Sequence, residues 1–187
     1  AHESGLPFDM GFIRNHYVGR TFIEPDQKMR DFGVKIKLNP SRDTVKGKRI
    51  VLVDDSIVRG TTSRKIIKML RRCKVKEIHY RVASPPIINS CHYGIDTPNR
   101  ERLIAYKMSK QDKQVDVEKI RKYLGVDSLA YLTIPAILEA TFGDKHHFCT
   151  ACFDNNYPTP TPYDYVIPQK NHNMIKDSSL DDIRHGR

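Results

Sequence analysis

The order of apolar and polar positions predicts a strand, a loop, a helix and a second strand in the middle of the chain. Residues 50–53 form a continuous, mostly β-branched apolar run, which is typical of a strand buried on both faces of a parallel sheet. Residues 63–72 carry apolar positions on one helical face and Lys and Arg on the other, which predicts an amphipathic helix. Residues 77–83 predict the next strand, which Ser84-Pro85-Pro86 ends. These elements fit a βαβ unit, so the two strands should be parallel and joined by a right-handed crossover.

Weaker patterns flank this unit. Residues 15–22 show neither helical nor strand periodicity, so we interpret them as a loop. From residue 158 onward, Pro alternates with Thr before a polar stretch, which predicts an extended or disordered tail over 158–187. The remaining predicted elements are a helix within 24–32, a strand over 34–38, a helix over 115–124, a strand over 129–132 and a helix over 134–142.

Composition and charge narrow the classes of ligand. The net charge is +10, from 32 basic and 22 acidic residues, which favours phosphate-rich ligands. The basic residues are spread along the chain without an interleaved aromatic platform, so nucleic acid is not favoured. No apolar run reaches the length of a membrane span. The first residues lack the pattern of a secretory signal, so we expect a cytoplasmic protein.

Four cysteines are present, and without a secretory signal a disulfide framework is not expected. The pair Cys149-Thr150-Ala151-Cys152 alone leaves three interpretations open: a zinc site, a redox pair or part of an iron–sulfur cluster. Neighbouring histidines keep zinc among these interpretations: His92, His146 and His147. Cys73 ends the amphipathic helix, and core packing explains it.

The chemistry concentrates in residues 54–63, directly after the predicted buried strand. Asp54 and Asp55 stand at the carboxyl end of that strand, where open α/β sheets bind ligands. Since side chains alternate along a strand, the two carboxylates should diverge and could accept hydrogen bonds from a vicinal diol or hold Mg²⁺. Gly60 and residues 61–63, all with hydroxyl side chains, then lead into the helix and offer an anion site. A ribose 5-phosphate that carries a further anionic group matches this pairing.

A simpler interpretation of this loop is an ordinary helix cap by Thr62 or Ser63. It explains the hydroxyl groups but leaves the two acids and Gly60 unexplained. A Walker-type phosphate loop is poorly supported, because no Gly-Lys-Ser/Thr sequence ends the turn.

Residues 50–63 resemble the signature of type I phosphoribosyltransferases and, more narrowly, that of the amidophosphoribosyltransferase family. The further segments that carry this resemblance, in order up to about Pro158, are Asn15-His16-Tyr17-Val18-Gly19-Arg20-Thr21-Phe22-Ile23, Lys37-Leu38-Asn39-Pro40, Ala83-Ser84-Pro85-Pro86-Ile87, Tyr93-Gly94-Ile95-Asp96 and Phe148-Cys149-Thr150-Ala151-Cys152-Phe153. The resemblance implies an α/β fold, with a parallel sheet and flanking helices. It also implies displacement of pyrophosphate from phosphoribosyl pyrophosphate by ammonia, in the first step of purine synthesis.

The resemblance also implies residue roles. Asp54 and Asp55 would meet the ribose hydroxyls and Mg²⁺. Residues 15–22 would close over the substrate, with Arg20 and Tyr17 as the catalytic residues and the Arg20 fork suited to pyrophosphate. The other substrate-binding residues would be Ser56, Val58, Arg59, Gly60, Thr61, Thr62 and Asn39.

For the cysteines, the resemblance favours a [4Fe-4S] cluster. Cluster-bearing members have one Cys shortly after the Ser-Pro-Pro-Ile segment and two in Phe-Cys-x-x-Cys-Phe. Cys91, Cys149 and Cys152 occupy those places. The fourth family ligand would lie upstream of Ala1.

The resemblance further implies an incomplete type I phosphoribosyltransferase fold. We expect a domain over 1–157 that lacks its first strand, with the family's cluster-ligand segments near 84–96 and 146–153. The family's glutaminase domain has no counterpart here, so the chain is expected to be a fragment or a split gene product. Expected partners are phosphoribosyl pyrophosphate, a glutaminase domain or other ammonia source, and further copies of the chain that pair at an exposed sheet edge. The alternative is a catalytically impaired fragment, or a module that binds phosphoribosyl pyrophosphate without turnover.

Overall fold

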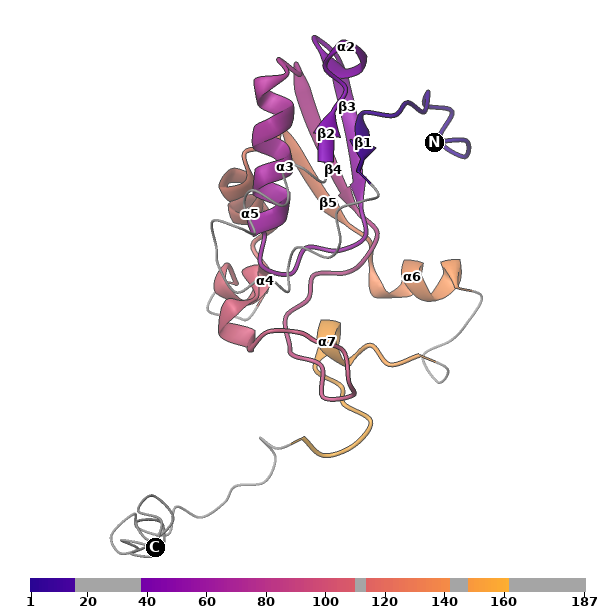
Figure 1. Cartoon of the computed structure of the whole chain (residues 1–187). Helices are drawn as coiled ribbons and strands as arrows, with labels where there is room; N and C mark the ends of the chain where they lie inside the picture. The colour runs from indigo at the N-terminus through magenta and orange to yellow at the C-terminus, as the bar shows by residue number, and fades with distance from the viewer. Residues whose placement is uncertain (16–37, 110–113, 142–147, 162–187) are drawn as a thin grey trace, which may run out of the picture.

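The computed structural model describes residues 1–15, 38–109, 114–141 and 148–161. Figure 1 shows a small parallel sheet with helices packed beside it and less regular segments at its carboxyl end. In chain order the elements are β1 Phe12–Arg14, β2 Leu38–Pro40, α2 Arg42–Val45, β3 Arg49–Asp54, α3 Thr61–Arg72, β4 Glu77–Val82, the 3₁₀ helix η2 Arg100–Arg102, α4 Ile104–Lys107, α5 Val117–Leu124, β5 Ser128–Tyr131, α6 Ile134–Ala140 and α7 Ala151–Asp154.

The central sheet has the strand order β3-β4-β5, with both pairs parallel. Val51 pairs with His79, and His79 pairs with Ser128, which fixes the register across all three strands. The predicted βαβ unit is therefore confirmed, and its helix α3 begins two residues earlier than the apolar pattern indicated. A separate antiparallel pair joins β1 to β2.

The hydrophobic core lies between the sheet and the helices α3 and α5. Ile67 and Leu70 of α3 are buried, as are Ile78 and Tyr80 of β4. Figure 1 shows both helices on the same side of the sheet. The apolar face of α3 is thus the face that the sequence predicted. Cys73, the C-cap residue of α3, belongs to this core, as expected from packing.

The opposite face of the sheet corrects the expectation that residues 50–53 are buried on both sides. Val51 is 47% exposed and Val53 is 67% exposed, because β3 is an edge strand whose second face no described element covers. Ile50 and Leu52 point toward the core and are partly buried. The continuous apolar run therefore reflects an alternating strand with an apolar outer face.

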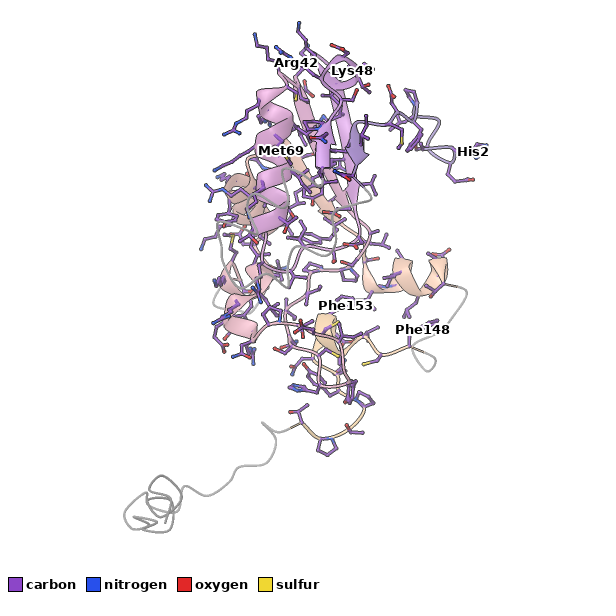
Figure 2. All side chains as sticks on the ribbon, viewed as in Figure 1. His2, Arg42, Lys48, Met69, Phe148 and Phe153 are labelled. Atoms are coloured by element: carbon purple, nitrogen blue, oxygen red, sulfur yellow. The ribbon has the colours of Figure 1, made fainter. Side chains whose placement is uncertain are left out.

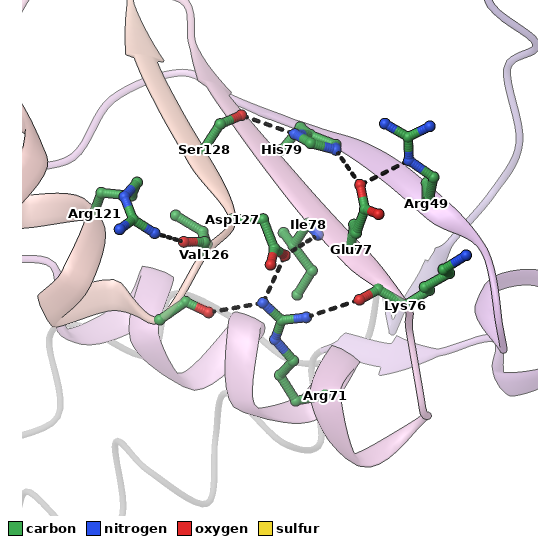
Figure 3. Close-up of polar contacts among 11 residues, drawn as sticks. Arg49, Arg71, Lys76, Glu77, Ile78, His79, Arg121, Val126, Asp127 and Ser128 are labelled. Carbon is green, nitrogen blue, oxygen red and sulfur yellow. Dashed lines mark hydrogen bonds and ion pairs between the residues drawn. The ribbon is translucent and has the colours of Figure 1, made fainter.

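Polar side chains line this uncovered face beside the two valines. His79 contacts both Ser128 (Nδ1 to Oγ, 2.8 Å) and Glu77 (Nε2 to Oε2, 3.0 Å). Arg49 donates to the same Glu77 oxygen at 2.7 Å, so the contacts cross all three strands (Figure 3). Hydrogen bonds from Arg49 and then from His79 hold the pKa of Glu77 below its usual value.

An Arg–Asp contact fixes the end of α3 against the sheet. Arg71 donates through Nη2 to Asp127 Oδ2 at 2.7 Å and to the Gly125 carbonyl at 3.1 Å. Asp127 Oδ2 also accepts from the backbone N–H of Ile78 at 2.7 Å (Figure 3). One carboxylate therefore connects α3, β4 and the turn between α5 and β5.

The other predicted elements have mixed outcomes. The predictions over 115–124, 129–132 and 134–142 correspond to α5, β5 and α6, each within two residues at either end. The predicted strand over 34–38 overlaps β2 only at Leu38, and its first four residues lie outside the described part of the chain. The predicted helix within 24–32 and the tail from residue 162 also lie outside it, whereas residues 158–161 are irregular. None of the helices in the described ranges has the length and apolarity needed to cross a bilayer.

Candidate functional site

The candidate site is the loop of residues 54–62, which connects β3 to α3 at the carboxyl end of the sheet. Ile57 anchors the loop from below, since its side chain is only 2% exposed. The carbonyl of Val58 accepts a hydrogen bond from the backbone N–H of Ile104 at 2.9 Å, which ties the loop to α4. The loop is therefore held at two points, and its polar residues are presented on a fixed backbone.

Asp54 is positioned by a buried tyrosine of the neighbouring strand. The hydroxyl of Tyr80, a residue with no exposed surface, donates to Asp54 Oδ2 at 2.5 Å. Asp54 Oδ1 accepts from the backbone N–H of Asp55 at 3.1 Å. Burial, and next the hydrogen bond to Asp54, raise the pKa of Tyr80, so the phenol stays protonated and keeps donating. One carboxylate of the pair is thus turned toward the core.

Asp55 is exposed, and this is the divergence that strand alternation predicted. Its Oδ1 accepts a hydrogen bond from Ser56 Oγ at 3.0 Å, and this contact orients the carboxylate. An exposed carboxylate beside a core-facing one suits a ligand with two neighbouring hydroxyls, or a cation approached from solvent.

Gly60 directly precedes α3 and makes the sharp turn from the loop into the helix. It is the N-cap residue, with φ at +74°, and no side chain makes a cap hydrogen bond at this helix start. The simpler interpretation, a cap by Thr62 or Ser63, is therefore wrong. A Cβ at residue 60 would lie 2.6 Å from Ile104 Cδ1, so glycine is required by space as well as by φ.

The first turn of α3 presents hydroxyl groups without a competing acid. Thr61 and Thr62 are exposed, whereas Ser63 is buried and hydrogen-bonds with Tyr80. No acidic residue stands in this turn. Since backbone N–H groups at a helix start attract anions, the turn offers a phosphate site next to the two acids.

The other predicted substrate residues differ in position. Val58 and Arg59 lie in the loop itself, with Arg59 exposed. Asn39 is exposed on β2, paired with Ile13 in the separate two-stranded sheet, and its role stays a prediction. Arg20 and Tyr17, the predicted catalytic residues, lie outside the described residues. The sequence analysis did not identify Tyr80 as part of the site. The sequence shows only that Tyr80 lies within the predicted strand after α3, and this does not reveal its contact with Asp54.

The cysteines of the predicted cluster lie where the loop after β4 meets α7. The carbonyl of Cys152 accepts from the backbone N–H groups of Ile88 (2.9 Å) and Asn89 (3.1 Å), which places these segments side by side. Figure 2 shows Phe148 and Phe153, which flank the Cys-x-x-Cys pair. Burial, and then the nearby charges of Cys149 and Cys91, raise the pKa of the Cys152 thiol to about 11.

These thiols do not form a metal-holding group in the described geometry. Across the described ranges, no three or more His, Cys, Asp or Glu side chains gather in a way that could hold a metal ion. Cys149 is exposed, and Cys91 and Cys152 are partly buried free thiols. The cluster role of these cysteines therefore stays a prediction, and His146 and His147 of the zinc alternative fall outside the described residues.

A parallel sheet with an acid pair and a glycine-capped helix at its carboxyl edge defines the class of protein: the fold is that of type I phosphoribosyltransferases. Two solved structures support this assignment at 45% identity each. One is a glutamine phosphoribosylpyrophosphate amidotransferase from B. subtilis complexed with ADP and GMP, with a TM-score of 0.69 over 85% of this chain and 34% of that chain. The other is described as the allosteric regulatory enzyme of purine biosynthesis, with a TM-score of 0.70 over 88% of this chain and 35% of that chain.

Curated relatives narrow the class. Amidophosphoribosyltransferase 1, chloroplastic, from Arabidopsis thaliana is 54% identical over 158 residues, 84% of this chain and 27% of the relative. Amidophosphoribosyltransferase from Synechococcus elongatus is 51% identical over the same share of this chain and 31% of the relative. No protein-family model matches the chain. The chain is homologous to part of the amidophosphoribosyltransferases, and it spans about a quarter to a third of their length.

Proposed function

We propose that this chain is the phosphoribosyltransferase part of an amidophosphoribosyltransferase. In this reaction ammonia attacks the anomeric carbon of phosphoribosyl pyrophosphate. The new C–N bond forms, the C–O bond to pyrophosphate breaks, and pyrophosphate leaves with the bonding electron pair. The attacking nitrogen then loses a proton, which gives 5-phosphoribosylamine.

The observation that carries this proposal is that residues 54–62 place a site for two hydroxyl groups next to a site for an anion. Asp55 is exposed beside Asp54, so the acids can accept hydrogen bonds from two ribose hydroxyls. Gly60, Thr61 and Thr62 stand at the start of α3, where backbone N–H groups favour the 5-phosphate. Relatives at about 50% identity that are named for this reaction support it.

Mg²⁺ fits the donor set of the acid pair. Asp54 and Asp55 supply carboxylate oxygens, and Mg²⁺ is commonly held by one or two carboxylates plus substrate phosphates. The ion would neutralise charge on the leaving pyrophosphate. Within this chain, Tyr80 orients Asp54 by its hydrogen bond, and Ser56 orients Asp55.

Other parts of the proposal rest on the relatives. Arg20 and Tyr17 are proposed to act on the pyrophosphate, and Cys91, Cys149 and Cys152 remain proposed cluster residues through which we derive no step. A glutaminase domain or another ammonia source, and further copies of the chain, are the proposed partners. Cytoplasmic location remains a proposal, since some plant relatives are named as chloroplastic.

Calorimetry of phosphoribosyl pyrophosphate binding, with and without Mg²⁺, tests the site. We expect Asp55→Asn to weaken binding about ten-fold or more, because it removes an exposed anionic acceptor of a charge-assisted hydrogen bond. The matched control is Asp43→Asn, an exposed carboxylate on α2, which precedes the amino end of β3. Equal affinity of Asp55→Asn and wild type would refute the loop assignment.

Turnover is tested separately by ammonia-dependent release of pyrophosphate. Release by the wild-type chain that Asp55→Asn abolishes would support the enzymatic proposal. Binding that depends on Asp55 without any release would instead support the alternative, a binding module for phosphoribosyl pyrophosphate.

A further inference from the structure

An arm of residues 1–10 leads away from the sheet and its helices (Figure 1). Its large apolar side chains are Leu6, Phe8 and Met10, and each is more than half exposed, with Phe8 at 76%. Residues 6–10 form neither helix nor turn, and Pro7 disfavours a helical conformation at Leu6. The apolar positions recur at every second residue, so in an extended arm they lie on one face. The arm is therefore suited to form a strand with one apolar side.

The outer face of β3 is a second exposed apolar surface. Val51 and Val53 lie on it, on the side of the sheet away from α3 and α5. Among the described residues, no strand pairs with the outer edge of β3, since the sheet order is β3-β4-β5. Backbone N–H and C=O groups along such an edge can accept a further strand. We call Val51, Val53 and this edge the open edge of β3.

The arm can complete the open edge as an added strand. Along a strand, residues two apart point their backbone N–H and C=O groups toward the same neighbour and their side chains toward the same face. If the apolar residues of the arm face β3, their side chains lie beside Val51 and Val53. Pro7, which has no N–H to donate, then faces away from the sheet, where proline is tolerated in an edge strand. The positions of the apolar residues and of the proline therefore agree with the same pairing.

Charge favours a second copy of this chain as the source of the arm. The arm contains the acids Glu3 and Asp9 and no Lys or Arg, in a chain whose net charge is +10. Basic residues flank the open edge: Lys46, Lys48, Arg49 and Arg81. Within one chain Asp9 contacts Lys48 at 3.4 Å, yet the two valines stay exposed. The acidic arm of another copy would therefore meet an uncovered surface of opposite charge.

We propose that two copies of this chain associate by exchanging arms. Each arm pairs with the open edge of the other copy, and the apolar side chains of the arm pack against Val51 and Val53. Each copy gives one arm and receives one, so the contact is closed and two-fold symmetric. The outer face is open in the monomer and is covered only in the dimer. This exchange identifies the contact between the copies proposed above as partners. It uses none of residues 54–62, so it does not depend on the proposed reaction.

Sedimentation equilibrium over a concentration series tests the association, in reducing buffer so that exposed Cys149 thiols cannot link copies. We expect the mass of the wild-type chain to rise from the monomer value toward twice that value. Phe8→Ser and Val53→Lys change exposed side chains, so each should leave unfolding of the dilute monomer unchanged and raise the Kd of the dimer about ten-fold or more. Ile95→Ser, at a residue that is 69% exposed in the loop after β4, is the matched control and should dimerise as the wild type does. A wild-type chain that stays monomeric up to about 1 mM would overturn the proposal, as would wild-type affinity in either variant.

Mixing the two variants tests the exchange itself. The Phe8→Ser chain keeps an intact open edge, and the Val53→Lys chain keeps an intact arm. A pair of unlike variants therefore retains one contact between arm and edge, whereas a pair of like variants retains none. With a fluorescent label on the Phe8→Ser chain, we expect the unlabelled Val53→Lys chain to raise its sedimentation coefficient at concentrations where each variant alone is monomeric. No such gain on mixing would overturn the proposal even if the wild-type chain dimerises. Neither measurement uses phosphoribosyl pyrophosphate, so failure of the exchange is distinct from failure of the proposed reaction.

Discussion

The hydroxyl of Tyr80 on β4 donates to the carboxylate of Asp54 at the end of β3. Tyr80 pairs with Leu52 in the sheet, so its side chain reaches along the core to the acid two residues further on. This contact connects the candidate site to the most buried part of the fold. Because Tyr80 lies in the core, we infer that it positions Asp54.

Replacement of Tyr80 by Phe should reveal this positioning role. The variant removes the donor to Asp54, and we expect a loss of about 1–3 kcal/mol in the free energy of unfolding, since the acceptor is charged. It should also weaken binding of phosphoribosyl pyrophosphate, because Asp54 Oδ2 can then rotate. Urea unfolding and calorimetry measure the two effects.

Tyr131→Phe is the matched control for this prediction. Its hydroxyl is buried and has no partner among the described residues, so its removal should be neutral or slightly stabilising. If Tyr80→Phe and Tyr131→Phe gave the same stability and the same affinity, the hydrogen bond to Asp54 would have no positioning role.

Gly60 provides a second prediction, because two separate constraints act on it. Gly60→Ala meets both a positive φ and a Cβ contact of 2.6 Å with Ile104, whereas Gly125→Ala meets a φ of +79° with no atom within 4 Å. The control, Gly125→Ala, should lower the free energy of unfolding by about 1 kcal/mol through backbone strain alone. Gly60→Ala should lower the free energy of unfolding by at least twice as much, and it should weaken phosphate binding because the loop shifts. Equal losses in thermal unfolding would show that the Ile104 contact relaxes freely.

Local periodicity was enough to predict the two strands and the helix of residues 49–82 and to place the acid pair at the carboxyl end of a parallel strand. The same pattern misjudged Val51 and Val53, because exposure of a strand face depends on which strand forms the edge and on what covers it. The role of Tyr80 depends on the register between β3 and β4, which no single segment encodes.

The correction on β3 leads to a third prediction. Val53 is 67% exposed and Val82 is 3% exposed, although both are valines near the carboxyl ends of adjacent strands. Val53→Thr should change the free energy of unfolding by less than about 0.5 kcal/mol, since its hydroxyl remains in water. Val82→Thr should cost about 1–3 kcal/mol, since a hydroxyl is placed in the core. A loss at Val53 as large as at Val82 would mean that the outer face is covered in solution, and denaturant titration of both variants decides this.

Acid stability should depend on Asp127, whose pKa lies below its ordinary value of 3.8. The hydrogen bond from the Ile78 N–H is the largest cause, and the contact with Arg71 adds to it. A carboxyl whose pKa is lower in the folded chain adds stability above about pH 4, and this contribution is lost as the pH falls through its folded value. The Asp127 side chain is 39% exposed, so solvent screening limits the Arg71 contribution to about 1 kcal/mol or less. Urea midpoints at pH 7 and pH 3 should therefore differ less for Asp127→Asn than for wild type. Asp43→Asn, the control, should retain the wild-type difference, and an unchanged pH dependence in Asp127→Asn would contradict the assignment.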